Sequence, residues 1–236
     1  MVGGHERQVN ESEPNMTSNA LLEEWARRVA DALPERTPQD QEIAVQTFRL
    51  LAKGEPVTPR QISEAANVSE EQVAETFHSL SGVLWDDQER IVGFFGLDIR
   101  HFKPSHAMEV GEATVYGWCA WDTLFITEIL GQEAHVESTD PNNGATVQLT
   151  VTPEGVTNVR PPEAVVSLLQ PEDSFGADVI ATFCHHIHFF TSAESAEEWM
   201  ADRPSLFTVT VDEAFQVGQM VNRLWLGSVI GSPLSP

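Results

Sequence analysis

Two closely spaced helix-start signatures place the strongest constraint on how this chain folds. Thr58-Pro59-Arg60-Gln61 and Ser69-Glu70-Glu71-Gln72 each carry Gln three residues after a hydroxyl side chain. In such a capping box, each of the two residues accepts a hydrogen bond from the other's backbone amide, which fixes the first turn of a helix. Pro59 falls at the first helical position, where a missing amide is harmless. With a tight turn around Asn67, the two short helices predict a helix-turn-helix.

A two-stranded hairpin is predicted directly after these helices. Residues 83–85 and 91–95 are rich in aliphatic and aromatic residues and flank a polar turn at 86–90. A further helix is expected to begin at residue 42 and to end near Gly54. Residues 42–100 together therefore predict a winged-helix unit.

The segment before this unit divides into three parts. Residues 1–18 are polar and lack hydrophobic periodicity, which predicts a disordered tail. Apolar residues at helical spacing predict an amphipathic helix over residues 19–33, and residues 35–41 are expected to be a linker. The predicted regions are thus a tail (1–18), an N-terminal helix plus winged-helix-like domain (19–100), and a second domain (101–236).

The second domain is expected to mix strands and helices. Strands are predicted at residues 113–118, 134–137, 145–152, 164–169, 180–190 and 207–211, and helices at 119–130, 192–201 and 212–225. The predicted fold class is therefore α+β, with an N-terminal winged-helix-like helical domain packed on a mixed α/β domain.

The charge of the chain weighs against a nucleic-acid or membrane partner. With 36 acidic and 13 basic residues the net charge is −23, and the second helix of the predicted helix-turn-helix carries three Glu and no Lys or Arg. Phosphate groups of nucleic acid or of an anionic membrane would be repelled. Such a surface is typical either of a highly solvated protein or of one adapted to high salt. The winged-helix unit is therefore expected to have a structural or covering role.

The cellular compartment can be predicted from what the sequence contains. The N-terminus shows no apolar signal-peptide region, and no run approaches the length of a transmembrane helix, so we expect a cytoplasmic protein. Two cysteines, Cys119 and Cys184, are too few for a disulfide framework. They are expected to be free thiols, packing residues or ligands.

Cys119 and Asp122 form the first candidate site. Spaced three residues apart on a predicted helix, they would share one face, and the helix N-terminus would lower the pKa of the thiol. Trp118, Trp121 and Phe125 would surround them with apolar side chains. The alternative is a small buried Cys in an aromatic core with Asp on the solvent side.

Cys184 stands in the second candidate site, the run from Phe183 to Phe190. On a strand, Cys184, His186 and His188 would face one side and could ligate zinc or copper. The spacing is not that of a zinc finger, and the alternative is that these histidines are core imidazoles bonded to backbone.

Two motifs in this order closely resemble the organomercurial lyase (alkylmercury lyase) family. They are the runs at residues 116–124 and 183–190, supported by flanking segments at 51–58, 149–153, 197–199, 213–215, 218–219 and 222–223. The resemblance implies protonolytic cleavage of the carbon–mercury bond, giving a hydrocarbon and mercuric ion. It also implies a catalytic set of Cys119, Asp122 and Cys184, and an N-terminal domain that covers the active site.

The implied chemistry suits these residue types. Mercury is a soft cation that prefers thiolates, and a second thiolate makes the mercury-bound carbon basic enough to accept a proton. Asp122 would relay that proton, and its pKa should be raised by desolvation. The mercuric product would be held by Cys119, Asp122 and Cys184. No organic cofactor or resident metal is expected, low-molecular-weight thiols would release the product, and mercuric reductase would receive it in a detoxification pathway.

Two further expectations allow this assignment to be tested. If one mercury binds both cysteines, their sulfur atoms should lie about 4–5 Å apart. Many family members carry further cysteines where this chain has Asp140 and His185, which puts an accessory thiol relay in doubt. The alternatives are a non-catalytic soft-metal-binding protein that uses Cys119, Cys184 and a nearby His, and a metal-sensing regulator.

Overall fold

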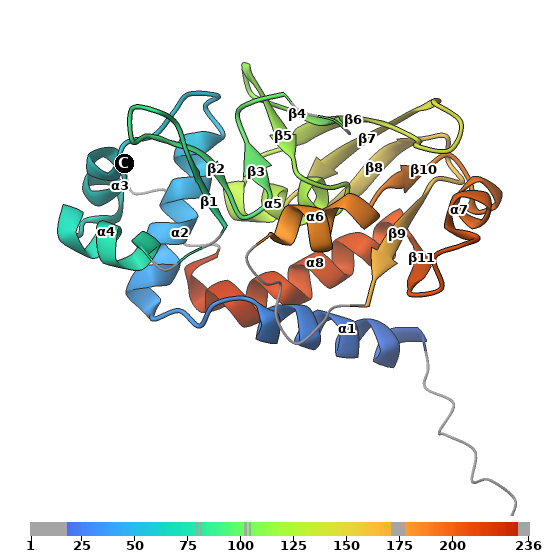
Figure 1. The fold of residues 1–236 in the computed structure, drawn as a ribbon, viewed down its shortest axis with the longest axis horizontal. Helices are drawn as coiled ribbons and strands as arrows, with labels where there is room; N and C mark the ends of the chain where they lie inside the picture. Colours follow the sequence, from blue (N-terminus) through green and yellow to red (C-terminus); the bar gives the residue numbers. More distant parts are fainter. Residues whose placement is uncertain are drawn as a thin grey trace, which may run out of the picture.

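The computed structural model describes residues 18–78, 80, 82–101, 103, 105–170 and 178–230, and over these it has an α+β fold (Figure 1). A large antiparallel sheet has the strand order β1-β2-β3-β5-β4-β6-β7-β8, and a smaller one has the order β10-β9-β11. The large sheet consists of β1 (Val83–Trp85), β2 (Ile91–Phe94), β3 (Leu97–Asp98), β4 (His106–Val110), β5 (Ala113–Gly117), β6 (Ala134–Thr139), β7 (Thr146–Thr152) and β8 (Gly155–Arg160). The small sheet consists of β9 (Val165–Leu169), β10 (Phe189–Phe190) and β11 (Leu206–Thr210).

Most of the helices lie at one end of the large sheet or across one of its faces (Figure 1). They are α1 (Ser18–Ala32), α2 (Pro38–Leu51), α3 (Pro59–Ala66), α4 (Glu70–His78), α5 (Asp122–Leu130), α6 (Val179–Thr182), α7 (Ala193–Met200) and α8 (Val211–Leu226), with 3₁₀ turns η1 (Cys184–His186) and η2 (Gly227–Val229). Helix α5 packs between the sheet and α8, and α1 runs alongside α8 on the side away from the sheet (Figure 1). The α1 helix is thus an outer cover of the domain that follows it in the sequence.

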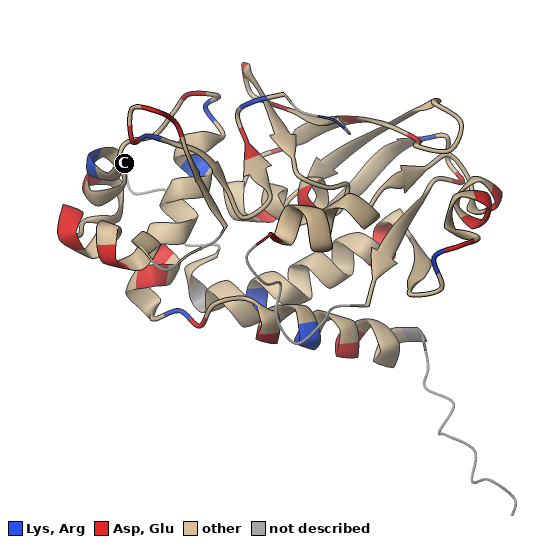
Figure 2. Cartoon of the chain, in the orientation of Figure 1, with Lys and Arg blue, Asp and Glu red and all other residues tan. Residues whose placement is uncertain are grey.

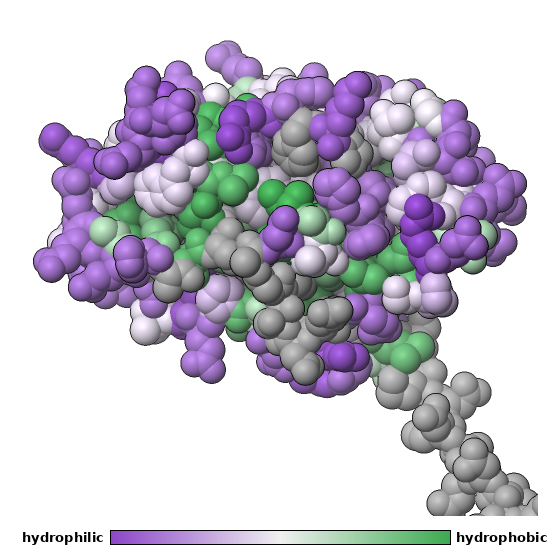
Figure 3. Space-filling model, viewed as in Figure 1, coloured by the Kyte–Doolittle hydropathy of each residue, from purple (hydrophilic) through white to green (hydrophobic). Residues whose placement is uncertain are grey.

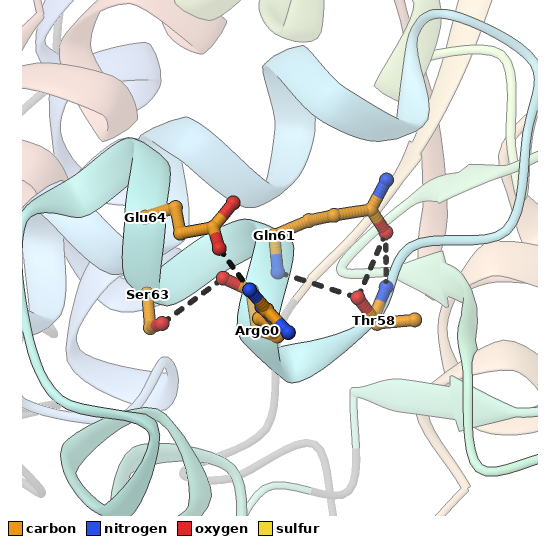
Figure 4. Close-up of polar contacts among 5 residues, drawn as sticks. All are labelled: Thr58, Arg60, Gln61, Ser63 and Glu64. Atoms are coloured by element: carbon orange, nitrogen blue, oxygen red, sulfur yellow. Dashed lines mark hydrogen bonds and ion pairs between the residues drawn. The ribbon is translucent and has the colours of Figure 1, made fainter.

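The predicted helix-turn-helix is confirmed at its capping boxes. The Thr58 amide donates to Gln61 Oε1 at 2.8 Å, and the Gln61 amide donates to Thr58 Oγ1 at 3.3 Å (Figure 4). Ser69 and Gln72 form the equivalent pair at the start of α4, at 2.9 and 3.2 Å. Asn67, with a φ of 54°, ends α3 in the left-handed conformation that its short polar side chain tolerates. Local sequence therefore predicts where both helices begin.

The predicted wing is also confirmed, and it continues into the large sheet. Strands β1 and β2 are antiparallel, with Val83 opposite Phe94. Strand β2 then pairs with β3, and β3 pairs with β5. The N-terminal wing and the strands after residue 101 consequently belong to one hydrogen-bonded sheet, which fixes the β2–β3 turn relative to the rest of the molecule.

Two predictions about local structure are wrong. Helix α2 begins at Pro38 rather than at residue 42, because Thr37 and Asp40 form a capping box that lies within the expected linker. The expected strand at 180–190 is instead α6, the η1 turn and the two-residue strand β10. Its composition reflects burial rather than strand pairing, since Ile187 and Phe189 are fully buried while their neighbours fold locally.

The predicted tail, residues 1–18, lies outside the described residues except for Ser18, where α1 begins. Acidic side chains are spread over the helices, and on α4 Glu70, Glu71 and Glu75 are all exposed (Figure 2). The face drawn in Figure 3 is mainly hydrophilic, with hydrophobic residues visible mostly near its middle. None of the helices in the described part of the chain is long and apolar enough to cross a membrane.

Candidate active site

The structure brings Cys119, Asp122 and Cys184 together. The ligand atoms of the three side chains all lie within 4.8 Å of one another. All three residues are buried, and both cysteines are free thiols. The two sulfur atoms are therefore no more than 4.8 Å apart, within the span of about 5 Å that a single bound mercury allows.

Cys119 and Asp122 meet in a turn rather than along a helix face. Helix α5 begins at Asp122, so the expected helix start at Cys119 is wrong. The backbone amide of Cys119 donates to Asp122 Oδ2 at 2.7 Å, and Thr123 Oγ1 donates to the carbonyl of Ala120 at 2.7 Å. These two bonds close the turn that connects β5 to α5. The carboxylate is thereby held against the loop that carries the thiol.

The N-terminus of α5 does not lower the pKa of the Cys119 thiol, contrary to the sequence prediction. Burial raises its pKa well above the usual range, and the hydrogen bond to Cys184 and the charge of Asp122 raise it further. The predicted lowering of this pKa is wrong, because desolvation of the thiolate outweighs the helix N-terminus. Cys119 is therefore a protonated thiol at neutral pH.

Cys184 approaches from the opposite side on the η1 turn. Asp178 caps α6 by accepting from the amide of Ala181 at 3.0 Å, and the Ile187 amide donates to the carbonyl of Cys184 at 3.1 Å. The loop is joined directly to the first one, because the amide of Ala120 donates to the Ile187 carbonyl at 3.2 Å. The thiol of Cys184 accepts a hydrogen bond from Cys119, which lowers its pKa, but burial and the charge of Asp122 leave that pKa raised.

Asp122 is an acid whose pKa suits proton transfer near neutral pH. Burial raises the pKa of the carboxyl to about 7, although hydrogen bonds from Cys119 and from the Trp118 amide act in the opposite direction. Both the raised pKa of Asp122 and its main cause, burial, agree with the sequence prediction. Near pH 7 such a carboxyl can accept a proton and give it up again, which is the property a proton relay needs.

An apolar pocket of about 240 Å³ opens onto Asp122 and Cys184. A cavity of ~150 Å³ with apolar walls is large enough to hold benzene. The pocket walls come from α1 and the residues after it, the β2–β3 turn, α5, α6 and α8; they include Val29, Leu33, Phe95, Trp121, Phe125, Phe183, Val221 and Trp225. The site therefore combines two thiols and an acid with space for a small hydrocarbon group.

The N-terminal region covers this pocket, as the resemblance implied, through α1 and the β2–β3 turn rather than through α3 or α4. Val29 and Ala32 of α1 and Phe95 of the β2–β3 turn line the pocket, whereas no residue of α3 or α4 is among its described lining. Trp85 of the wing packs on Phe77 and is 42% exposed. Sequence reasoning missed α1 and Gly96 as parts of the site.

The histidines near Cys184 do not join the cluster. Among the described residues, the group able to hold a metal consists of Cys119, Asp122 and Cys184. His185 is exposed, and the ring of His188 donates from Nε2 to the His185 carbonyl at 2.9 Å. Burial lowers the pKa of His188 to about 4, so this imidazole is neutral. The alternative of core imidazoles bonded to backbone thus describes His188 better than that of a ligand.

Asp140 ties two loops together. Its Oδ2 accepts hydrogen bonds from the amide and hydroxyl of Thr191 and from Ser195 Oγ, each at 2.8 Å. Its Oδ1 accepts from the Asn142 amide. In this chain the position holds the β6–β7 turn against the start of α7.

Comparison with known sequences gives two family matches. Residues 102–222 match the alkylmercury lyase family model, and residues 24–95 match the model of the helix-turn-helix domain of alkylmercury lyase. The alkylmercury lyase of Pseudomonas putida is 33% identical over 199 residues, which cover 84% of this chain and 92% of that protein. That of Streptomyces lividans is 36% identical over 172 residues, which cover 73% of this chain and 78% of that protein.

A solved structure has the same fold. The crystal structure of the mercury-bound form of MerB2 superposes with a TM-score of 0.68 at 20% sequence identity, covering 86% of this chain and 98% of that one. At this identity the likeness concerns the fold alone. The sequence matches, which include both the helix-turn-helix region and the segment with the two cysteines, lead to the conclusion that this chain belongs to the alkylmercury lyase family.

Proposed function

We propose that this chain cleaves the carbon–mercury bond of organomercurials by protonolysis, and that Cys119, Asp122 and Cys184 carry out the reaction. Membership of the family makes the chain an organomercurial lyase. The assignment of roles to the three residues rests on one observation, the convergence of two thiols and an acid of pKa about 7 at an apolar pocket.

Capture of the substrate begins at Cys184. This thiol lines the pocket, whereas Cys119 is not among the described residues that line it. Its sulfur displaces the ligand X of R–Hg–X, and the thiol proton leaves with X as HX. The organic group R occupies the apolar pocket, where the side chains of Trp121 and Phe125 exclude water from it.

Cys119 supplies both the second thiolate and the proton. The thiol transfers its proton to the carboxylate of Asp122, to which it is hydrogen-bonded, and the new thiolate binds mercury. Two thiolates on one mercury increase the electron density on the bound carbon. Asp122 then donates the proton to that carbon, the electron pair of the carbon–mercury bond forms the carbon–hydrogen bond, and the hydrocarbon leaves.

The product of this step is a mercuric ion bound by both thiolates. The carboxylate of Asp122, again ionised, lies within reach as a further ligand and offsets the positive charge. The reaction needs no organic cofactor and no resident metal, because mercury is substrate and product. Low-molecular-weight thiols remove the ion, and mercuric reductase is the proposed recipient, which places the chain in cytoplasmic mercury detoxification. The exposed glutamates of α4 disfavour a nucleic-acid partner.

The function is tested by incubating the protein with phenylmercury and excess thiol and measuring benzene by gas chromatography and mercuric ion in parallel. The expected result is benzene and mercuric ion in equal amounts over many turnovers. An Asp140→Asn variant, which alters a buried carboxylate outside the pocket, serves as the control and should remain active. A protein that retains phenylmercury through gel filtration but releases no benzene would be a passive soft-metal binder.

A further inference from the structure

The turn between β2 and β3 brings Gly96 against the carboxyl group of Asp122. A Cβ atom added at Gly96 would lie 2.5 Å from Asp122 Oδ1 and 2.6 Å from its Cγ. Real side chains do not approach one another so closely. We propose that Gly96 is a positioning residue for Asp122, and that its bare backbone keeps the acid in reach of both Cys119 and the substrate carbon. This inference rests on the proposed function, since it assigns Asp122 the role of proton donor.

The two oxygens of the carboxyl group face different partners. Oδ2 accepts the amide hydrogen of Cys119 at 2.7 Å, whereas Oδ1 is the atom nearest to the position of a Cβ on Gly96. The carboxyl therefore occupies a slot between the β2–β3 turn and the Cys119 loop, and a methyl group at residue 96 would fill part of that slot.

The turn itself is held firmly, so it cannot retreat from an added methyl group without breaking other contacts. The Phe95 amide donates to the Gly82 carbonyl at 2.9 Å, and the Gly96 carbonyl accepts from the Trp118 amide at 2.8 Å. The ring of Phe95 packs on Phe94 and Trp225 at centroid distances of 5.1 and 5.3 Å. The strain of an added side chain would consequently fall on Asp122.

Backbone conformation also favours glycine at this position, and the experiment must separate this effect from the contact. Gly96 has a φ of 102°, where a side chain is strained whatever space surrounds it. Gly111, in the β4–β5 turn, has a φ of 59°, and a Cβ there would meet nothing within 4 Å. Gly111→Ala is thus a control that adds a methyl group to a left-handed glycine without touching the site.

The first measurement compares capture with release for Gly96→Ala and Gly111→Ala. Both variants keep the two thiols, so each should bind one phenylmercury per chain. In Gly96→Ala, single-turnover release of benzene should fall about 10²-fold, the size of loss expected when a reacting group is displaced by about 1 Å. Gly111→Ala should release benzene at the parent rate. Equal release rates for the two variants would overturn the proposal.

The second measurement detects the contact without any turnover. Gly96→Ala is made in the parent chain and in an Asp122→Ala background, and the free energy of unfolding is measured for all four proteins. Removing the Asp122 carboxyl removes the clash, so Gly96→Ala should destabilise the Asp122→Ala chain much less than the parent. Even if Gly96→Ala does not fold in the parent, the double variant should fold. Equal destabilisation in both backgrounds would show that a side chain at residue 96 does not clash with Asp122.

The two measurements keep the inference separate from the function on which it rests. If the parent chain releases no benzene, the proposed function fails, while the unfolding cycle still reports on the contact between Gly96 and Asp122. If the parent is active and the cycle shows no coupling, the positioning role of Gly96 fails and the proposed function stands.

Discussion

The backbone amide of Cys119 donates a 2.7 Å hydrogen bond to the carboxyl group of Asp122, the first residue of α5. This bond attaches the side chain of Asp122 to the loop that carries Cys119, and Cys184 takes no part in it. A second hydrogen bond, from the Ala120 amide to the Ile187 carbonyl, joins that loop to the one carrying Cys184. Three residues from two distant parts of the chain thus form one site through main-chain contacts.

Keeping Asp122 buried should cost stability at high pH. Its pKa is raised from 3.8 to about 7 by burial. Unfolding lets the carboxyl ionise, so its contribution to stability is complete below pH 3.8 and is lost as pH rises to about 7. At about 1.4 kcal/mol per pKa unit, the loss is about 4 kcal/mol.

Asp122→Asn should therefore be more stable than the parent at pH 8, by up to a few kcal/mol, and the difference should shrink toward pH 4. Urea unfolding of both proteins across this range measures it. A difference that does not change with pH would show that Asp122 ionises normally in the folded protein.

Two buried histidines should make the protein sensitive to acid. Burial lowers the pKa of His106 to about 3 and that of His188 to about 4, and their rings lie 5.9 Å apart. Both are neutral in the folded state, so their contribution to stability is complete above pH 6.5 and is lost as pH falls toward 3.

His106→Gln keeps a polar group beside Ser138 but cannot take up the proton. Between pH 6 and 4 its unfolding free energy should decline less steeply than that of the parent, by about 1.4 kcal/mol per pH unit. His135→Gln, at an exposed histidine, is the matched control. If both variants show the parental slope, proton uptake by His106 does not contribute to acid unfolding.

Each cysteine should be essential for turnover but not for first capture. Cys119→Ser and Cys184→Ser each leave one thiol, which still binds phenylmercury, whereas a second thiolate is required to make the carbon basic. We expect retained mercury after gel filtration and no benzene above background. Release of benzene at the parent rate by either variant would remove that cysteine from the mechanism.

Close packing between α8 and α5 should depend on Gly218. A Cβ at this position would lie 2.6 Å from the Cβ of Phe125, a residue that lines the pocket. Gly218→Ala should therefore destabilise the fold by about 1–3 kcal/mol through overpacking. Gly155→Ala, where a Cβ would meet nothing within 4 Å, should change stability little. Thermal unfolding compares the melting temperatures of the two variants. Equal melting temperatures would mean that α8 moves away from α5 at no cost in stability.

Local sequence signals were sufficient for much of the fold. The capping boxes at Thr58 and Ser69 each involve residues only three positions apart. The helix starts that they form therefore depend little on distant contacts. The polar turn at residues 140–144 likewise predicts the antiparallel pairing of β6 and β7.

The errors have both local and distant causes. The start of α2 was missed although its capping box, Thr37 and Asp40, is local. The run before Phe190 has the composition of a strand, yet the Ile187 carbonyl accepts from the amide of Ala120, which is distant in the sequence. The raised pKa of Cys119 depends on complete burial, which no local pattern reveals. The proximity of Cys119 and Cys184 could be anticipated from family resemblance alone, because they are far apart in the sequence.

The central claim of this account is that Asp122 delivers the proton to carbon, and one measurement tests it most directly. Asp122→Asn is loaded with one equivalent of phenylmercury, and single-turnover release of benzene is followed together with the mercury retained after gel filtration. General acids typically contribute about 10²–10⁴-fold, so release should slow by that factor while mercury stays bound by the two thiols. Release of benzene at the parent rate would contradict the claim, and the proton would then have to come from a cysteine thiol or from water.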